Sequence, residues 1–396
     1  MTTTTPSKPP VPADAYPASS VGFDLFGLIF LLVFQIGGYV DGWAHNTLAV
    51  VETFFTPWHA ILYAGFALSA LYILIPLFRN RAKGYAWTHA VPKGYFVSVI
   101  GIIIFGVFGF CDMIWHIVFG VEANIDAFMS PPHLGLFTGS LLMISGPVCA
   151  LVSRNDSDKR SWSKNAPAVL AMLTFFLSFT FLLQPWVAIG TSDAASVTGP
   201  ASARWTSAVT EAAKAPYRIG TSDIVGLHAL DTTAKEQPAN SNILIVYLHR
   251  IGVATIMLYT IIFMGIFLYL LALGRVPVGS FTVLFTIDVA FVSIMRSSWL
   301  APGLVGAQIV VGLASGIAAD LLYTWLKPTL DSKRALYLFS FFTPAIFFIF
   351  YFIEVQLNGG IWWSEHMVVG SIIYAGAVGL LMAALTSAGY SANRAR

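Results

Sequence analysis

Ten runs of predominantly apolar residues, most of them 20 or more residues long, constrain the fold of this chain more than any motif does. An α-helix needs about 20 apolar residues to cross the hydrocarbon core of a bilayer. A segment in lipid must also pair all of its backbone polar groups, which a helix does within itself. The sequence therefore predicts an all-α integral membrane protein of about ten transmembrane helices. The predicted spans are residues 22–43, 50–78, 94–120, 131–153, 166–190, 243–273, 277–295, 303–326, 334–356 and 366–389.

The composition excludes several other classes of protein. Of the 396 residues, 57% are hydrophobic and only 10% are charged, whereas a soluble domain carries about 25% charged residues. This deficit rules out a water-soluble globule and a disordered chain. The net charge of +2 is too small to indicate a nucleic acid as partner. Cys111 and Cys149 lie in apolar runs and cannot form a disulfide framework. The expected partner is the lipid bilayer.

The chain divides into three regions. Residues 1–21 are rich in Thr, Pro and Ser and are expected to be a disordered cytoplasmic tail. Residues 22–153 carry four predicted helices, and residues 166–389 carry six. The connection at residues 191–242 is the one long loop, expected on the outer side, and it is too short for a separate catalytic domain.

Charge in the loops predicts the orientation in the membrane. Most of the 21 Lys and Arg residues fall in alternate loops and at the two ends of the chain. The positive-inside rule places these loops and both termini in the cytoplasm. Most of the eight histidines fall on the opposite side, together with several carboxylates. We therefore expect a multi-pass protein of the cell (inner) membrane with its chemistry at the non-cytoplasmic face.

The first of two related helical hairpins reads DGWAHNTLAVVETFFTPWHAILYAG from Asp41. Asp41 and His45 are four residues apart and share one face of a helix. The Thr-Pro pair is typical of a helix start, so the returning helix brings His59 toward them. One carboxylate and two imidazoles suit a first-row metal such as copper, zinc, iron or nickel. Glu52, in the loop, is a candidate catalytic residue that could serve as a general base.

The second hairpin repeats the pattern with Asp112, His116 and His133, the last after Ser-Pro-Pro. A single histidine in a membrane helix more often bonds to a neighbouring helix than to a metal. Two matching triads favour a functional site, because ionisable groups are costly inside a membrane. We predict metal at one or both triads, and we interpret the fold as repeated hairpins.

Other polar residues in the second half give weaker signals. A third, degenerate version of the pattern runs through Glu354, Glu365 and His366. Asp288 and Asp320 lie inside predicted spans, where an unpaired carboxylate is costly. We expect structural hydrogen bonds for both, with a proton route as the alternative. The helix neighbours expected as partners are Ser293, Gln308 and Tyr323.

The string FTPWH at residues 55–59, following Asp41 and His45, resembles the C subunit of the copper membrane monooxygenases, the particulate methane and ammonia monooxygenase family. The resemblance covers roughly residues 20–150. It implies that both triads bind copper and that one activates dioxygen for attack on a small apolar substrate, alkane-like or ammonia-like. It also implies other monooxygenase subunits, an electron donor and a homo-oligomer as partners. The sequence departs from the family at Glu52, where Asp is usual.

The leading hypothesis is thus a copper-dependent membrane monooxygenase or a subunit of one, with Asp41, His45, His59 and Glu52 as catalytic residues. Zinc or iron is the alternative metal. The competing functions are a metal transporter, for which Asp288 and Asp320 would line a path, a non-catalytic accessory subunit, and, ranked last, a zinc hydrolase.

Overall fold

The computed structural model describes residues 12, 14–47, 54–120, 126–153, 161–184, 237–297, 302–358, 361 and 363–394. Within these ranges the regular structure is helical, and nine helices are long and apolar enough to cross a membrane. This confirms the predicted class, an all-α multi-pass membrane protein. The helices are α1 (Val21–Thr47), α2 (Pro57–Ala82), the short 3-10 helix η1 (Trp87–His89), α3 (Phe96–Phe119), α4 (Asp126–Met129), α5 (Pro131–Val152), α6 (Trp162–Leu182), α8 (Gln237–Leu273), α9 (Ser280–Ser297), α10 (Pro302–Leu326), α11 (Lys333–Asn358) and α12 (Glu365–Arg394).

Each predicted span contains one of these helices, but some boundaries were wrong. The second span was expected from residue 50, whereas α2 begins at Pro57, because proline fits the first position of a helix. The fifth, expected at 166–190, is α6 at Trp162–Leu182. Helix α9, at the seventh predicted span, has 18 residues and is not among the nine helices long and apolar enough to cross a membrane, so the described residues give nine such helices where ten were predicted. The predicted loop at 191–242 and the tail at 1–21 lie largely outside the described residues.

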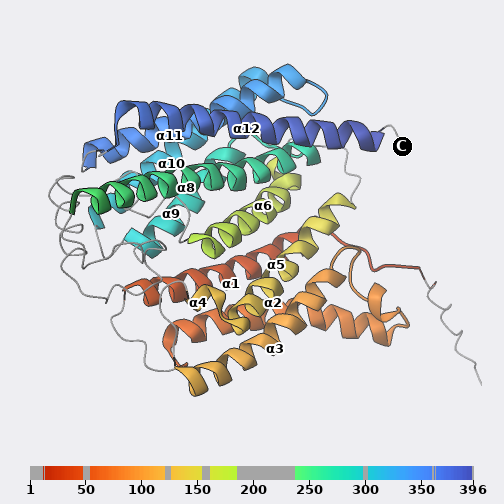
Figure 1. Cartoon of the computed structure of the whole chain (residues 1–396). Coiled ribbons are helices and arrows are strands. Elements are labelled where there is room, and N and C mark those ends of the chain that lie inside the picture. Colours follow the sequence, from red (N-terminus) through yellow and green to blue (C-terminus); the bar gives the residue numbers. More distant parts are fainter. Residues whose placement is uncertain are drawn as a thin grey trace, which may run out of the picture.

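The helices run side by side in two groups (Figure 1). Helices α1 to α5 form one group, α8 to α12 form the other, and α6 lies between them, in contact with α1, α5, α8 and α9. The start of α1 and the end of α12 lie at the same end of the bundle (Figure 1). The end of α1 and the start of α2 lie at the opposite end (Figure 1), where the candidate site is found.

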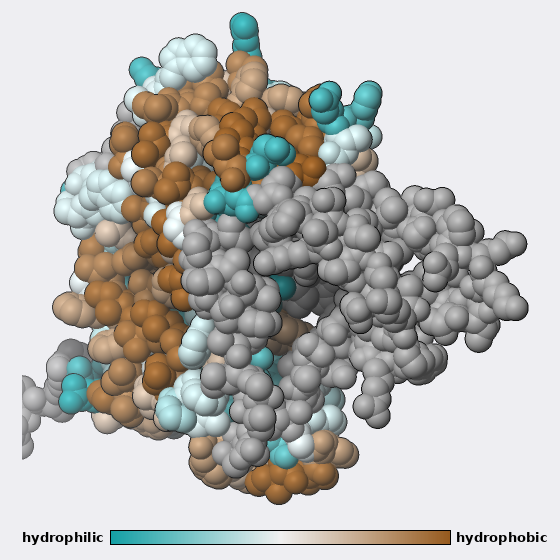
Figure 2. Space-filling model, turned by 90° about the vertical axis from the view of Figure 1, so that its left-hand side faces the viewer, coloured by the Kyte–Doolittle hydropathy of each residue, from teal (hydrophilic) through white to brown (hydrophobic). Residues whose placement is uncertain are grey.

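Apolar side chains fill the inside and also cover the outside. Helix α3 is an example, since Ile103, Phe110 and Ile117 are each more than half exposed. Figure 2, which views one end of the bundle, shows apolar residues over much of the described surface. A soluble monomer rarely exposes apolar patches of such extent. The exposed apolar side chains along α3 therefore fit contact with lipid.

Glycines bring the two helices of each hairpin into backbone contact. A Cβ atom on Gly65 of α2 would lie 2.6 Å from Cα of Phe34 in α1. A Cβ atom on Gly139 of α5 would lie 2.6 Å from the backbone nitrogen of Phe105 in α3. Small residues allow such close approach between membrane helices. Each hairpin is therefore held at a fixed register by a contact that larger side chains would prevent.

Substituting Gly101 by Ala is expected to destabilise the protein. The new Cβ atom would lie 2.3 Å from the backbone nitrogen of Met143, so α3 and α5 must separate. Overpacking of this kind costs about 1–3 kcal/mol of unfolding free energy. The midpoint of a thermal melt in detergent measures the loss. Gly106→Ala on the same helix is the control, because its nearest contact is a Phe66 ring atom at 3.7 Å. Equal midpoints for the two variants would contradict the close packing.

Candidate metal centre

The first triad lies where α1 ends and α2 begins. Asp41 and His45 are on the last turns of α1, and His59 is the third residue of α2. Oδ1 of Asp41 lies 3.1 Å from Nε2 of His59 and 3.9 Å from Nε2 of His45. The side chains of Asp41 and His45 are partly exposed, whereas that of His59 is almost fully buried. The predicted convergence of one carboxylate and two imidazoles is therefore present in the structure.

The glycine contact explains why these side chains meet. Asp41 follows Phe34, the residue that touches Gly65, by seven positions, and His59 precedes Gly65 by six. Seven residues of helix advance about 10.5 Å and six advance about 9 Å. Because α1 and α2 are antiparallel, both displacements run toward the same end of the pair. Asp41 and His59 thus reach nearly the same height from a common point of contact.

The second triad has the same register. Asp112 follows Phe105 by seven positions, and His133 precedes Gly139 by six. Oδ1 of Asp112 lies 3.5 Å from Nε2 of His116 and 3.7 Å from Nδ1 of His133. Sixteen residues separate His116 from His133, against thirteen between His45 and His59, and this longer spacing does not keep His133 out of the triad. The short helix α4 lies in this connection.

The two helix starts differ in how their capping hydroxyl is used. Thr56 precedes α2, and its Oγ1 accepts a hydrogen bond from the backbone N–H of His59 at 3.3 Å. Ser130 precedes α5 but makes no such cap. Its Oγ instead lies 2.6 Å from Nδ1 of His133. The first triad is thus positioned through the helix backbone, and the second through the imidazole itself.

Backbone carbonyls orient two of the rings. Nδ1 of His59 lies 2.6 Å from the carbonyl oxygen of Phe54, and Nδ1 of His116 lies 3.3 Å from that of Gly120. A carbonyl can only accept, so in each neutral ring the proton is on Nδ1 and the lone pair is on Nε2. These Nε2 atoms point at the aspartate oxygens. This orientation by a second hydrogen bond is typical of metal-bound histidine.

The contacts fit a bound cation. Oδ1 of Asp41 and Oδ1 of Asp112 are buried and accept no hydrogen bond. Each faces an imidazole lone pair, so either a proton or a metal ion must lie between the two acceptors. In each triad the three ligand atoms lie within 4.8 Å of one another. Ligands bound at about 2.1 Å can be at most about 4.2 Å apart, so small side-chain movements would complete the coordination.

The two triads lie side by side. The rings of His59 and His116, one from each triad, have centroids 6.5 Å apart. The ring of Phe54 lies 5.1 Å from His59 and 6.2 Å from His116. We refer to the six ligands and Phe54 together as the paired centre. The sequence predicted each triad but not their adjacency, and it gave no signal for Phe54.

Other predicted site residues do not join the paired centre. Glu52 lies outside the described residues, so its candidate catalytic role stays a prediction. Glu354 is buried, whereas Glu365 and His366 are exposed at the start of α12. Among the described residues, the two triads are the only groups of three or more potential ligands close enough to hold one ion. The degenerate third pattern therefore does not form a site.

The two buried aspartates of the second half are hydrogen-bonded, but to other partners than expected. Asp288 accepts from Thr180 and Tyr259, and Asp320 accepts from backbone N–H groups at the start of α9 and from Thr282. The donors lie on other helices than the aspartates that they bond: Thr180 on α6 and Tyr259 on α8 for Asp288, and Thr282 on α9 for Asp320. Among the hydrogen bonds of the described residues, those to the two aspartates include none from Ser293, Gln308 or Tyr323.

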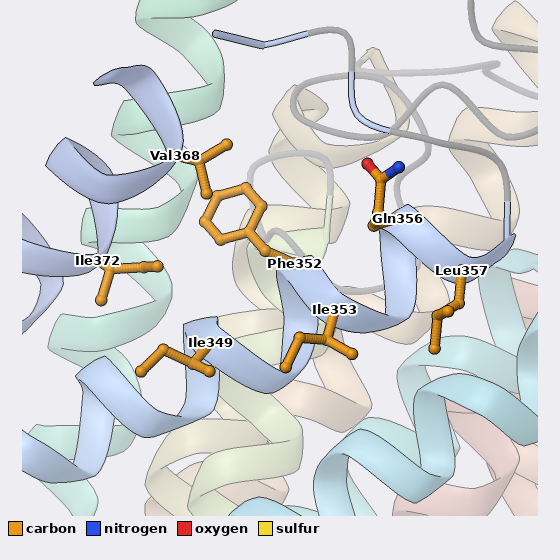
Figure 3. Close-up of a pocket in the computed structure, with 7 residues that line it drawn as sticks. All are labelled: Ile349, Phe352, Ile353, Gln356, Leu357, Val368 and Ile372. Atoms are coloured by element: carbon orange, nitrogen blue, oxygen red, sulfur yellow. The ribbon is translucent and has the colours of Figure 1, made fainter. Parts of the chain in front are cut away.

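A shallow apolar groove of about 300 Å³ lies between α11 and α12, away from the helices of the paired centre. Figure 3 shows the ring of Phe352 pointing toward Val368 across it. Gln356 is its one polar lining residue, and its side-chain oxygen accepts from the backbone N–H of Ile361 at 3.2 Å. The groove offers apolar contact but no ligand for a metal.

No protein-family model, curated protein or solved structure matches this chain. The paired centre must therefore be interpreted from its own geometry, together with the motif that the sequence carries.

Proposed function

We propose that this chain is a metal-dependent membrane oxygenase, or the metal-holding subunit of one, which uses dioxygen to oxidise a small apolar substrate. The observation that carries the proposal is the pairing of buried, unbonded aspartate oxygens with imidazole lone pairs in two adjacent triads. Ionisable groups at membrane depth mark functional sites by default. Six of them gathered in one place support chemistry more than helix packing.

Copper is the metal of the proposal. Two imidazoles and a carboxylate suit several first-row metals, including the iron of non-haem oxygenases. The motif that resembles the copper membrane monooxygenases favours copper among them. A bound copper ion supplies electron transfer to dioxygen. The ligands would be Asp41, His45 and His59 in one triad, and Asp112, His116 and His133 in the other.

The surrounding residues suit this role. The carbonyls of Phe54 and Gly120 hold the imidazoles of His59 and His116 so that Nε2 faces the site. The two carboxylates supply negative charge that balances a cation. The ring of Phe54 adds an apolar wall between the triads. An apolar substrate could reach such a wall from the lipid, and an electron donor would be a separate protein.

The arrangement favours this function over metal transport. Each triad lies at one end of its helices, and the rings of His59 and His116, one from each triad, have centroids only 6.5 Å apart. A transported ion needs successive sites that it can enter and leave. Among the described residues, no group of three ligands follows at another depth.

Metal analysis and oxygen uptake test the proposal together. The protein is purified in nanodiscs, its metal content is measured, and a chemical reductant is added with a short alkane or ammonia. We expect copper in the protein and oxygen uptake that depends on the substrate. With isotope-labelled dioxygen, we expect one labelled oxygen atom in the oxidised alkane. Zinc alone, or copper without substrate-dependent uptake, would contradict an oxygenase. Metal flux into liposomes would support the transporter.

A further inference from the structure

A separate polar cluster links four helices in the core. Asp288 lies in the middle of α9 and is fully buried. Its Oδ1 accepts from Oγ1 of Thr180 in α6 at 2.7 Å, and its Oδ2 accepts from the hydroxyl of Tyr259 in α8 at 2.9 Å. The hydroxyl of Tyr39 in α1 lies 2.9 Å from Oγ1 of Thr180 and donates to the carbonyl of Leu177 at 2.9 Å.

Among the described residues, no cation pairs with this carboxyl group. Every ion pair recorded in the described part of the chain belongs to the two metal triads. The titratable groups facing Asp288 are the phenols of Tyr39 and Tyr259, and its remaining donor is Thr180. Its surroundings are otherwise apolar, since Phe285 and Val289 beside it are fully buried. An ionised carboxylate is very costly in such a place, whereas a neutral carboxylic acid is not.

Asp320 provides a contrast within the same half of the protein. It accepts from the backbone N–H groups of Gly279 and Thr282 at 3.0 and 2.9 Å, and from the Thr282 hydroxyl at 2.6 Å. These groups lie at the N-terminal end of α9, where the helix dipole stabilises negative charge. Backbone N–H groups can only donate, so this site fits an ionised carboxylate. The two buried aspartates thus have opposite surroundings.

The hydroxyl groups around Asp288 can accommodate a proton on it. With Oδ1 protonated, the carboxyl group donates to Thr180, and Thr180 donates to a carbonyl of its own helix, that of Phe176 at 2.9 Å or Leu177 at 3.2 Å. With Oδ1 deprotonated, Thr180 turns its hydrogen toward Asp288, and Tyr39 donates to Thr180. In both arrangements each hydroxyl or carboxyl hydrogen of Asp288, Thr180 and Tyr39 has an acceptor, because Tyr39 can donate either to the carbonyl of Leu177 or to Thr180. Tyr39 and Thr180 remain neutral throughout.

We propose that Asp288 is a proton-binding site in the membrane core, and that Thr180 links its carboxyl group to the hydroxyl of Tyr39. The ligand is a proton, held as a neutral carboxylic acid. The cluster joins α8 and α9 of one helix group to α1 of the other, through α6. The site does not depend on metal binding at the paired centre, because none of the six ligands takes part in it.

Infrared spectroscopy of the purified protein tests this inference. We expect the wild type to show the carbonyl stretch of a carboxylic acid, shifted in heavy water and lost in Asp288→Asn. Tyr259→Phe is expected to move the same band to higher frequency, because the carbonyl oxygen loses a hydrogen bond. Asp320→Asn is the matched control, and it should lose carboxylate bands while keeping the acid band. Both readouts use the whole protein without added metal.

Two results would overturn the proposal. If Asp288→Asn removes carboxylate bands and no acid band, Asp288 is ionised and a cation must accompany it. If the acid band persists in Asp288→Asn and does not move in Tyr259→Phe, it belongs to another residue. Tyr259→Phe removes a single hydroxyl group, so it also gives an answer if Asp288→Asn accumulates poorly.

Discussion

Replacing His59 by Ala is expected to abolish metal binding at the first triad. His59 supplies the nitrogen closest to Asp41, at 3.1 Å, and its ring is held in place by the carbonyl of Phe54. Loss of an outer group that orients a ligand weakens metal binding about 10–100-fold. Loss of the ligand itself should exceed that, so the affinity of this triad should fall by more than about 100-fold. Copper titration of the purified protein, read by metal analysis after dialysis, measures the change.

Matched variants make this result specific. His133→Ala should remove metal from the second triad, and the double variant should bind none. His366→Ala is the control, because His366 is exposed at the start of α12 and belongs to neither triad. Its metal content should equal that of the wild type. Undiminished copper in His59→Ala would show that the first triad is a packing arrangement and not a site.

Replacing Asp320 by Ala is expected to cause the largest loss of stability outside the paired centre. Its carboxylate accepts from Gly279, from Phe281 at 3.4 Å, and twice from Thr282. Alanine would leave these donors at the start of α9 without their acceptor. Each buried unsatisfied donor costs about 1–3 kcal/mol. Because water can reach some of them after relaxation, we expect a net loss of about 3 kcal/mol.

The thermal midpoint in detergent, checked by denaturant titration, measures this loss. Asp320→Asn should be intermediate, because the amide keeps one acceptor and loses the charge. Asp331→Ala is the control, since Asp331 is exposed in the connection before α11. A midpoint of Asp320→Ala within the error of this control would mean that α9 is held by apolar packing alone.

The helices and both triads could be predicted from the sequence because local rules determine them. Apolar runs long enough to cross a bilayer can only become helices in lipid. Asp41 and His45 share a helix face through their spacing, and Pro57 marks the start of the returning helix. These features depend on residues close together in the chain. The structure confirms the helices, and it brings the three side chains of each triad together.

The remaining features depend on residues far apart in the chain. Asp288 bonds to Thr180 across 108 positions, and no periodicity in either helix indicates that pairing. The adjacency of His59 and His116 depends on how the two hairpins pack, which neither hairpin specifies alone. Sequence patterns describe which face a residue occupies. They do not say which helix lies opposite.

The glycine contacts have a consequence for how such a protein can change. Inserting one residue between Phe34 and Asp41 would rotate Asp41 by about 100° around α1, away from His59. An insertion in the connection between the helices would leave both intervals intact, as the differing loop lengths of the two hairpins illustrate. The loops are thus free to diverge and to gain new recognition properties. The short helical intervals between each triad and its glycine contact, at Gly65 in one hairpin and Gly139 in the other, tolerate no insertion or deletion.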